Sequence, residues 1–159
     1  MEAISLLQAL PGQAILKSSS WYLTEPVGLE DPEWFVNGVV LMETPLTPGV
    51  LLTRMLEIEK AMGRERTIKW GPRVIDLDLL CYDQLILREP HLILPHPLME
   101  KRRFVLEPMA EIAPDYVHPV LQKTMARLRD ELAPEGQGLI KLAGRKEENI
   151  EYRISNIEC

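Results

Sequence analysis

The chain has 159 residues, of which 46% are hydrophobic, and a formal net charge of −6 at pH 7. This length and composition suit one globular domain with a single core and exclude a largely disordered chain. The acidic balance argues against general nucleic-acid binding, and no apolar run approaches the roughly 18 residues that a membrane span requires.

Helical and extended patterns alternate along the chain. In chain order they predict a helix over 2–10, strands over 14–23 and 34–43, a helix from 48 to about 62, a strand over 74–82, an extended stretch over 91–97 followed by a short helix, and a helix over 120–132. Pro11-Gly12 ends the first helix, and Thr47-Pro48 supplies a cap and a first-turn proline for the second. This alternation favours an α/β or α+β sandwich.

The two cysteines and the N-terminus bear on the compartment. Cys81 and Cys159 have neither metal-ligand spacing nor the pattern of a disulfide framework, which favours a reducing environment. The N-terminus carries Glu2 and no basic region typical of a signal peptide. We therefore expect a cytoplasmic protein without a membrane partner.

The segment WGPRVIDLD at residues 70–78 places two aspartates in a predicted strand. Because side chains alternate along a strand, Asp76 and Asp78 point to one face, roughly 6.5–7 Å apart, while Ile75, Leu77, Leu79 and Cys81 cover the other face. Such a pair is costly to bury unless solvent, a shared proton, arginines or divalent cations relieve its repulsion. For the bare pair alone, an exposed strand face remains an alternative.

Basic residues are concentrated around this segment. They are Lys60, Arg64, Arg66, Lys69 and Arg73, and Lys101–Arg103 form a second cluster. Guanidinium groups suit phosphate oxygens, and Mg²⁺ prefers one or two carboxylates together with phosphates and water. Taken from the residues alone, the aspartates and arginines together indicate an Mg-nucleotide enzyme with chemistry on phosphorus. For the basic clusters by themselves, a solvated face is the alternative.

Four ordered motifs resemble those of the 6-hydroxymethyl-7,8-dihydropterin pyrophosphokinase family. They are SSSWYLTEPVG, FVNGVV, WGPRVIDLDLL and LPHPLMEKRRFVLEPMAEIAPD, and the resemblance extends over about residues 2–132. It implies a ferredoxin-like α+β sandwich with an antiparallel sheet. It also implies transfer of the β,γ-pyrophosphoryl unit of ATP to the hydroxymethyl group of the pterin, with release of AMP, in folate biosynthesis.

The resemblance further implies roles for individual residues. The catalytic residues would be Arg64 and Arg73, and the ligands of two Mg²⁺ ions would be Asp76 and Asp78. The ATP contacts would be Arg66, Trp70, Ile93, His96 and Arg102. The pterin contacts would be Thr24, Val27, Phe35, Asn37, Glu59 and Phe104. The expected partners are these two small molecules, and the protein would be a monomer or a homodimer.

The chain departs from the family pattern at both ends. The family begins with a strand before its first helix, whereas this chain starts within that helix, so the resemblance implies a sheet that lacks an internal strand and part of the site. We expect a pyrophosphokinase domain over 1–134 and an extension over 135–159. The extension is expected to be a disordered appendage or, through its IEYRI stretch, a strand on an exposed sheet edge, in this chain or a partner chain.

Two other functions stay open at this point. A truncated, non-catalytic relative would bind nucleotide or pterin without forming AMP. An Mg-dependent phosphohydrolase would use the same aspartate pair and release phosphate in the absence of pterin.

Overall fold

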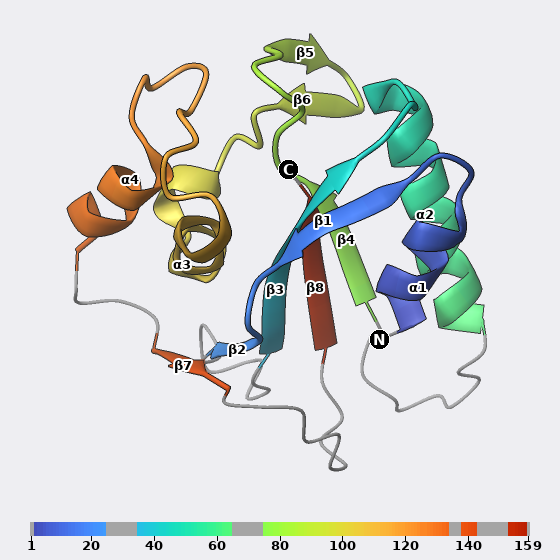
Figure 1. Cartoon of the computed structure of the whole chain (residues 1–159), viewed down its shortest axis with the longest axis horizontal. Coiled ribbons are helices and arrows are strands. Elements are labelled where there is room, and N and C mark those ends of the chain that lie inside the picture. Colours follow the sequence, from blue (N-terminus) through green and yellow to red (C-terminus); the bar gives the residue numbers. More distant parts are fainter. Residues whose placement is uncertain (1, 25–34, 65–74, 134–137, 143–152, 159) are drawn as a thin grey trace.

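The computed structural model describes five stretches of the chain: residues 2–24, 35–64, 75–133, 138–142 and 153–158. In these stretches a β-sheet lies between two pairs of helices (Figure 1). The predicted α+β sandwich is therefore confirmed, and it is consistent with a ferredoxin-like fold. None of the helices within the described stretches is both long and apolar enough to cross a membrane.

Each face of the sheet is covered by its own pair of helices (Figure 1). Their bounds are α1 Glu2–Ala9 and α2 Pro48–Arg64 on one face, and α3 Arg103–Ile112 and α4 Met125–Glu131 on the other. Met55 of α2 packs in one apolar core with Leu77 and Leu79, whereas Met109 of α3 packs in a second core with Val39. Burial of apolar side chains on both faces thus holds the three layers together.

The strands form a six-stranded sheet and a separate hairpin. They are β1 Ala14–Ser18, β2 Tyr22–Thr24, β3 Phe35–Glu43, β4 Ile75–Leu79, β5 Leu87–Glu89, β6 Leu92–Leu94, β7 Leu139–Lys141 and β8 Arg153–Glu158. The order in the large sheet is β4-β8-β3-β2-β7, and β1 also pairs with β3. The pairs that β1, β2, β3 and β7 form with one another are antiparallel.

Strand β8 lies in the interior of the sheet, between β3 and β4, and runs parallel to both. Ile154 pairs with Val36 on one side and with Ile75 on the other. The sequence predicts a sheet without an internal strand and a tail that is disordered or on an edge. The structure differs on the first point, because the tail itself supplies an internal strand. On the second point the tail does form a strand, but that strand lies inside the sheet and not on its edge.

The hairpin β5–β6 leads the chain back to the end of β4. After β6, the His96 N–H donates a hydrogen bond of 2.7 Å to the Leu80 carbonyl. A short 3₁₀ turn, Met99–Lys101, then precedes α3. This path places His96 and Arg102 beside the strand that carries the two aspartates.

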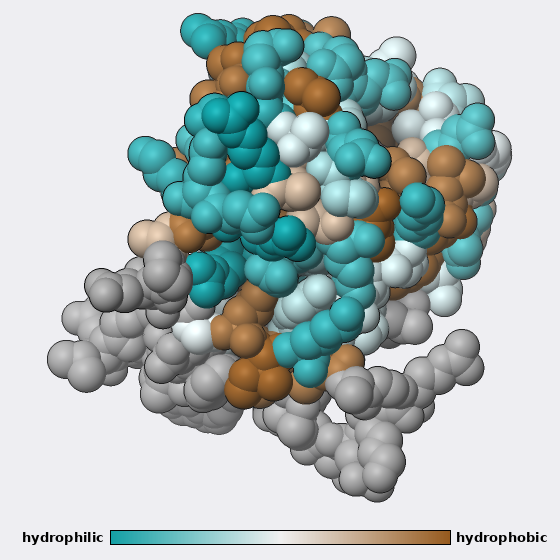
Figure 2. Space-filling view, turned by 60° about the vertical axis from the view of Figure 1, so that its left-hand side comes forward, coloured by the Kyte–Doolittle hydropathy of each residue, from teal (hydrophilic) through white to brown (hydrophobic). Residues whose placement is uncertain are grey.

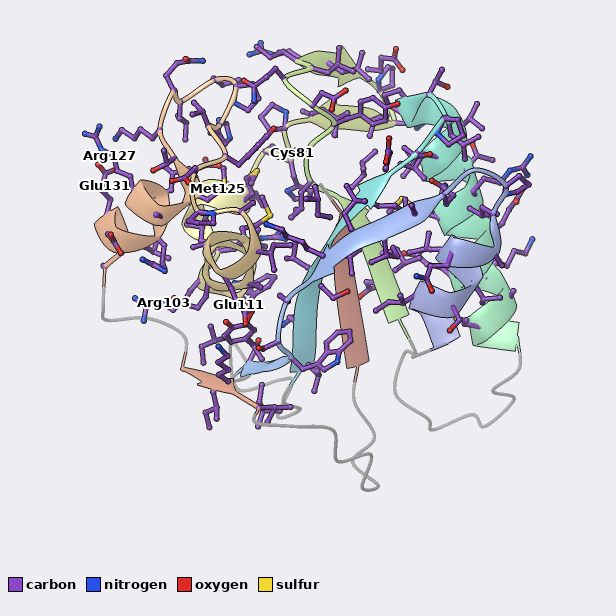
Figure 3. All side chains as sticks on the ribbon, viewed as in Figure 1. Cys81, Arg103, Glu111, Met125, Arg127 and Glu131 are labelled. Carbon is purple, nitrogen blue, oxygen red and sulfur yellow. The ribbon has the colours of Figure 1, made fainter. Side chains whose placement is uncertain are left out.

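Three predicted details need correction. The predicted strand over 14–23 is split into β1 and β2, because the Ser19 hydroxyl replaces a backbone acceptor for the Val39 N–H (2.9 Å). The helical spacing of Leu52, Met55 and Leu56 predicts an apolar stripe on the second helix, but Leu56 is 53% exposed. The buried stripe of α2 includes Met55 and runs otherwise through Leu51, Ile58 and Met62. Cys81 follows the end of β4 and packs on the α3 side, 3.7 Å from the Met99 sulfur (Figure 3).

The outer surface of the molecule is mixed in character. The face turned forward in Figure 2 is mostly hydrophilic, and its hydrophobic residues form separate groups. On the outside of α4, Arg127 and Glu131 form an ion pair of 2.9 Å between Nε and Oε1 (Figure 3). Exposed pairs of this kind contribute little to stability, so the two cores dominate.

Candidate functional site

Two carboxylates lie on the α3 face of strand β4. Leu77 and Leu79 are buried in the core on the α2 face, so alternation along the strand directs Asp76 and Asp78 to the opposite face. Both aspartates are partly exposed. The predicted placement of this pair on one face of a strand is confirmed.

The pairing register brings Asp76 into one row with Asn37. Ser155 of β8 pairs with Asp76 on one side and with Asn37 on the other. Residues that share a row of a sheet direct their side chains to the same face. Two residues further along, Asp78 and Val39 flank β8 in the same way, and Val39 packs beneath α3. The carboxylates of β4 and the amide of β3 therefore share one face.

Glu59 adds a third carboxylate at the outer edge of β4. It accepts a hydrogen bond of 2.5 Å from the Leu77 N–H. Burial raises the pKa of the Glu59 carboxyl, the Leu77 hydrogen bond opposes that shift, and the charges of Asp76 and Asp78 raise the pKa further. The Glu59 side chain therefore binds the outer edge of β4, and its pKa depends on the charge of both aspartates.

Asp78 lies close to two basic side chains. Burial raises the pKa of the Asp78 carboxyl, while His96 and Arg102 act in the opposite direction. Burial also lowers the pKa of the His96 imidazole, so His96 is mostly neutral at pH 7. Arg102 is therefore the permanent positive charge beside Asp78.

A flat apolar surface adjoins this charge. The Arg102 guanidinium carbon lies 5.5 Å from the centroid of the Phe104 ring, within the range of a cation–π contact. Phe104 is half-buried on α3 and packs against the second core. The ring therefore has a fixed position, and a planar ligand could stack on it.

Asn37 and Thr24 form a buried polar pair at the edge of the site. They are 2% and 1% exposed, and Asn37 Nδ2 donates to Thr24 Oγ1 at 2.6 Å. A carboxamide has a second N–H and an oxygen with two lone pairs. The Thr24 contact fixes the orientation of that amide on the α3 face.

A cavity of about 610 Å³ lies beside His96. Ile93, which is 45% exposed, lines it, and so does His118, which lies outside the motifs of the sequence. His118 Nδ1 accepts the N–H groups of Val120 and Leu121, which places its proton on Nε2. His96 and His118 each precede a proline, and the Nδ1 atom of each accepts a hydrogen bond from a backbone N–H that follows. The second His-Pro pair in the sequence could therefore have indicated His118 as a site residue.

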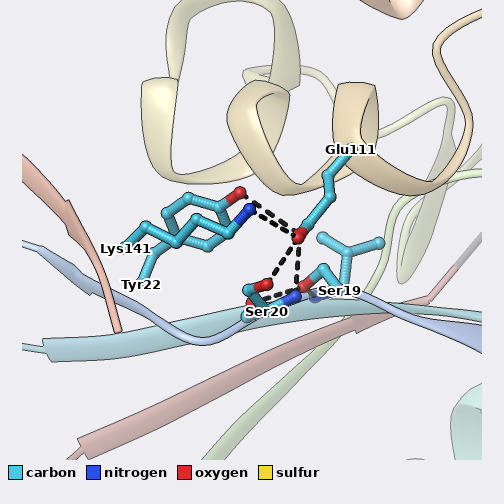
Figure 4. Close-up of polar contacts among 6 residues, drawn as sticks. Ser19, Ser20, Tyr22, Glu111 and Lys141 are labelled. Atoms are coloured by element: carbon cyan, nitrogen blue, oxygen red, sulfur yellow. Dashed lines mark hydrogen bonds and ion pairs between the residues drawn. The ribbon is translucent and has the colours of Figure 1, made fainter. Parts of the chain in front are cut away.

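Glu111 fastens α3 to the strands beside the site (Figure 4). Its carboxylate accepts from the Ser20 N–H (2.7 Å), the Ser20 hydroxyl and the Tyr22 hydroxyl (3.2 Å), and pairs with Lys141 Nζ at 3.2 Å. Burial alone would raise the pKa of Glu111, but the hydrogen bonds from Ser20 and Lys141 lower it. Tyr22 pairs with Asn37 in the sheet. The contact between Glu111 and Tyr22 therefore stabilises the row of residues that contains Asn37 and Asp76.

The remaining predicted residues are placed only in part. Val27, Arg66, Trp70 and Arg73 lie outside the described residues. Arg64 is the last residue of α2 and Phe35 the first of β3, and the structure describes their backbone.

The described residues include no group of three or more His, Cys, Asp or Glu side chains arranged to hold a metal ion. Asp76 and Asp78 nevertheless suit Mg²⁺, which binds through one or two carboxylates and completes its shell with phosphates and water. The raised pKa of Asp78 shows that burial disfavours its charge, and a cation would relieve that cost.

A comparison with protein families finds a match over residues 1–114. The family is described as 7,8-dihydro-6-hydroxymethylpterin-pyrophosphokinase (HPPK). The matched residues include every described element from α1 to α3, and therefore both aspartates, His96 and Arg102. Strands β7 and β8 lie beyond the match.

Curated proteins from several organisms are similar over the same region. A 2-amino-4-hydroxy-6-hydroxymethyldihydropteridine pyrophosphokinase of Methylorubrum extorquens is 47% identical over 115 residues, or 72% of this chain and 73% of the relative. A protein of the same name from Synechocystis is 42% identical over 130 residues, or 82% of this chain and 66% of the relative. The folic acid synthesis protein fol1 of Schizosaccharomyces pombe is 38% identical over 84% of this chain, which corresponds to 18% of that protein.

Proposed function

The chain belongs to the 7,8-dihydro-6-hydroxymethylpterin-pyrophosphokinase family, and we propose that it transfers pyrophosphate from ATP to 6-hydroxymethyl-7,8-dihydropterin in folate biosynthesis. The hydroxymethyl oxygen attacks the β-phosphorus of ATP. The bond from that phosphorus to the α,β-bridging oxygen breaks, AMP leaves, and the hydroxymethyl group loses its proton. The products are AMP and the pterin diphosphate.

One observation carries this proposal. The Asp76 carboxylate and the Asn37 amide belong to the same row of the sheet and lie on the same face, with β8 between their two strands. Asp76 and Asp78 suit the phosphate half of the reaction, and Asn37 suits the amide-like edge of a pterin. A site with both halves on one rigid face can hold two substrates in position for an in-line attack.

We assign the pterin side to the β3 end of the site. The Phe104 ring would stack on the flat pterin, and Asn37, held by Thr24, would bond to its edge. Glu59 is proposed as a pterin contact through the resemblance alone, because its carboxylate lies at the outer edge of β4, two strands away from Asn37. Val27 and Phe35 belong to the same proposal, on the strength of the motifs alone.

We assign the nucleotide side to the loop after β6. Arg102, beside Asp78, would bind phosphate oxygens, and the cavity lined by Ile93 and His96 would take the remaining part of ATP. Arg66 and Trp70 are proposed as further ATP contacts. Arg64 and Arg73 are proposed to stabilise charge on the transferred group, so their loss would lower kcat more than affinity.

Mg²⁺ is proposed as the cofactor, in two ions held by Asp76 and Asp78. Bound there, it would neutralise the triphosphate and orient the β-phosphorus. The aspartates themselves keep the two charges on one face of β4, and Arg102 balances part of that charge before ATP binds.

The test is AMP formation from ATP and Mg²⁺, with and without hydroxymethyldihydropterin, beside the Asp76→Ala variant. We expect AMP that depends on the pterin and disappears in the variant. Phosphate release without pterin would instead indicate a phosphohydrolase. Binding of ATP and pterin without AMP would indicate a non-catalytic relative.

A further inference from the structure

An element outside the family match holds the two halves of the site together. The match ends at residue 114, whereas β8 (Arg153–Glu158) is the strand between β3 and β4. In register, Ser155 separates Asp76 from Asn37. Two strand spacings amount to roughly 9–10 Å, so β8 sets the distance between the phosphate side and the pterin side.

The hydrogen bonding at β4 shows how firmly this strand depends on β8. β4 ends the strand order, and the Leu77 N–H points outward to the Glu59 carboxylate. Because N–H groups alternate sides along a strand, those of Asp76 and Asp78 point inward to β8. The backbone of both aspartates is therefore fixed by β8, and their side chains follow.

The same alternation divides the residues of β8 between its two neighbours. In a parallel ladder with this register, Ile154, Asn156 and Glu158 bond to β4, and Arg153, Ser155 and Ile157 bond to β3. Substitution by proline removes one N–H, so each site weakens the pairing on one side.

We propose that β8 is the positioning strand of the active site, which keeps the aspartates of β4 in register with Asn37 of β3 and so is required for turnover rather than for binding of either substrate. This proposal rests on the proposed function. Each half of the site has its own support without β8. Helix α2 contacts β4 through Glu59, and α3 contacts β2 through the hydrogen bond between Glu111 and the Tyr22 hydroxyl. What β8 adds is their mutual distance.

The experiment compares Asn156→Pro and Ser155→Pro in the full chain, with Ile140→Pro as a matched control on β7. Ile140 is 52% exposed and lies on the strand at the far end of the order, beside β2. We expect the dissociation constants of ATP and of the pterin, each measured alone, to stay within about threefold of the unsubstituted chain. We expect kcat to fall at least about 100-fold in the two β8 variants, since a displacement near 1 Å has that effect. The control should keep its kcat.

Two outcomes overturn the proposal. One is an unchanged kcat in both β8 variants. The other is loss of both affinities together with kcat, which would make β8 a general fold element. If the proline variants unfold, Asn156→Gly is measured in their place. Glycine keeps the backbone N–H at this position but makes the strand more flexible. A lowered kcat with unchanged affinities would then support the proposal, and an unchanged kcat would overturn it.

A second measurement separates this proposal from the proposed function. Amide hydrogen exchange of the unsubstituted chain should show protection across 153–158, 75–79 and 35–43. Exchange of 153–158 at the rate of an unstructured peptide would overturn the role of β8, whatever the activity. Protected amides in a chain that forms no AMP would refute the proposed function and leave β8 as the link between the two strands.

Discussion

At the scale of single residues, the site is a set of carboxylates whose charges are kept close together. Burial raises the pKa of both Asp78 and Glu59, and Asp76 raises each of them further. Arg102 offsets part of this repulsion at Asp78. When these carboxylates are ionised and no ligand is bound, their mutual repulsion destabilises the site. A bound cation or a basic ligand would reduce that repulsion and so stabilise the site.

The first prediction concerns the charge of Asp78. Asp78→Asn keeps the shape of the side chain and removes the charge, so we expect kcat to fall on the order of 10²–10³-fold while the chain stays folded. Steady-state AMP formation measures the effect, and Asp115→Asn, at an exposed position, is the matched control. A variant that keeps more than about a third of the kcat would contradict the assigned role.

The second prediction concerns Glu59 and pH. Its pKa in the folded protein is raised above the unfolded value, so the ionised form opposes folding. The stability linked to the protonated form is full below the unfolded pKa and is lost as pH rises through the folded pKa. Glu59→Gln should therefore raise the Tm at pH 7 and leave it unchanged near pH 4, because the amide oxygen still accepts the Leu77 N–H.

Thermal unfolding of the ligand-free protein at the two pH values measures this difference. Glu57→Gln, two residues before Glu59 on α2 and exposed, is the control and should show no such difference between the two pH values. A lower Tm of Glu59→Gln at pH 7 would mean that the carboxylate charge stabilises the fold.

At the scale of elements, Glu111 is the main polar link between α3 and the strands. Its pKa is lowered in the folded protein, so its contribution is present above the unfolded pKa and is lost as pH falls through the folded value. Glu111→Gln should lower the free energy of unfolding at pH 7 by about 1–2 kcal/mol, after allowance for solvent screening. Near pH 3 the difference should disappear.

Denaturant unfolding at both pH values tests this prediction, with Glu107→Gln on the same helix as the control. An equal loss of stability at pH 3 and pH 7 would show that the shape of the side chain, rather than its charge, makes the link. An unchanged free energy at pH 7 would remove Glu111 from the set of stabilising contacts.

The elements also show what the sequence could predict. Local patterns were sufficient for α1, α2 and β3, and alternation around Leu77 correctly oriented the aspartate pair. The short helix predicted after residue 97 corresponds to the 3₁₀ turn Met99–Lys101, whereas α3 itself was not predicted. Pro108 lies inside α3 and interrupts the local helical pattern there. The hairpin strand β5 was missed, because its three residues include Arg88 and Glu89 and carry no periodic signal.

The candidate site was predictable where its residues lie in motifs and less so elsewhere. Asp76, Asn37 and His96 occur in quoted motifs, and the structure brings them to one side of the sheet. The contact of Glu59 with the Leu77 N–H could not be predicted, because it depends on β4 being the outermost strand. The interior place of β8 could not be predicted either, since pairing partners distant in sequence leave no local pattern.

At the scale of the whole molecule, the two cores share one sheet and should unfold together. Met55 and Met109 are both fully buried, on opposite faces. We expect Met55→Ala and Met109→Ala each to lower the free energy of unfolding by about 2–5 kcal/mol. A single transition should remain in both variants, because the sheet couples the two faces.

Near-UV and far-UV circular dichroism during denaturant unfolding report on this coupling. Leu56→Ala, at a side chain that is 53% exposed, is the control and should change stability far less. Two separate transitions in either methionine variant would show that the faces unfold independently.

The interior place of β8 also has a consequence for synthesis of the protein. On the ribosome, β3 and β4 emerge well before residues 153–158, so for that interval both strands present unpaired edges. The pairing of Val36 with Ile154 then has to close a very long loop, which slows folding. The nascent chain is therefore most exposed to self-association just before its sheet can close, and chaperone capacity should govern its yield more than the stability of the finished fold does.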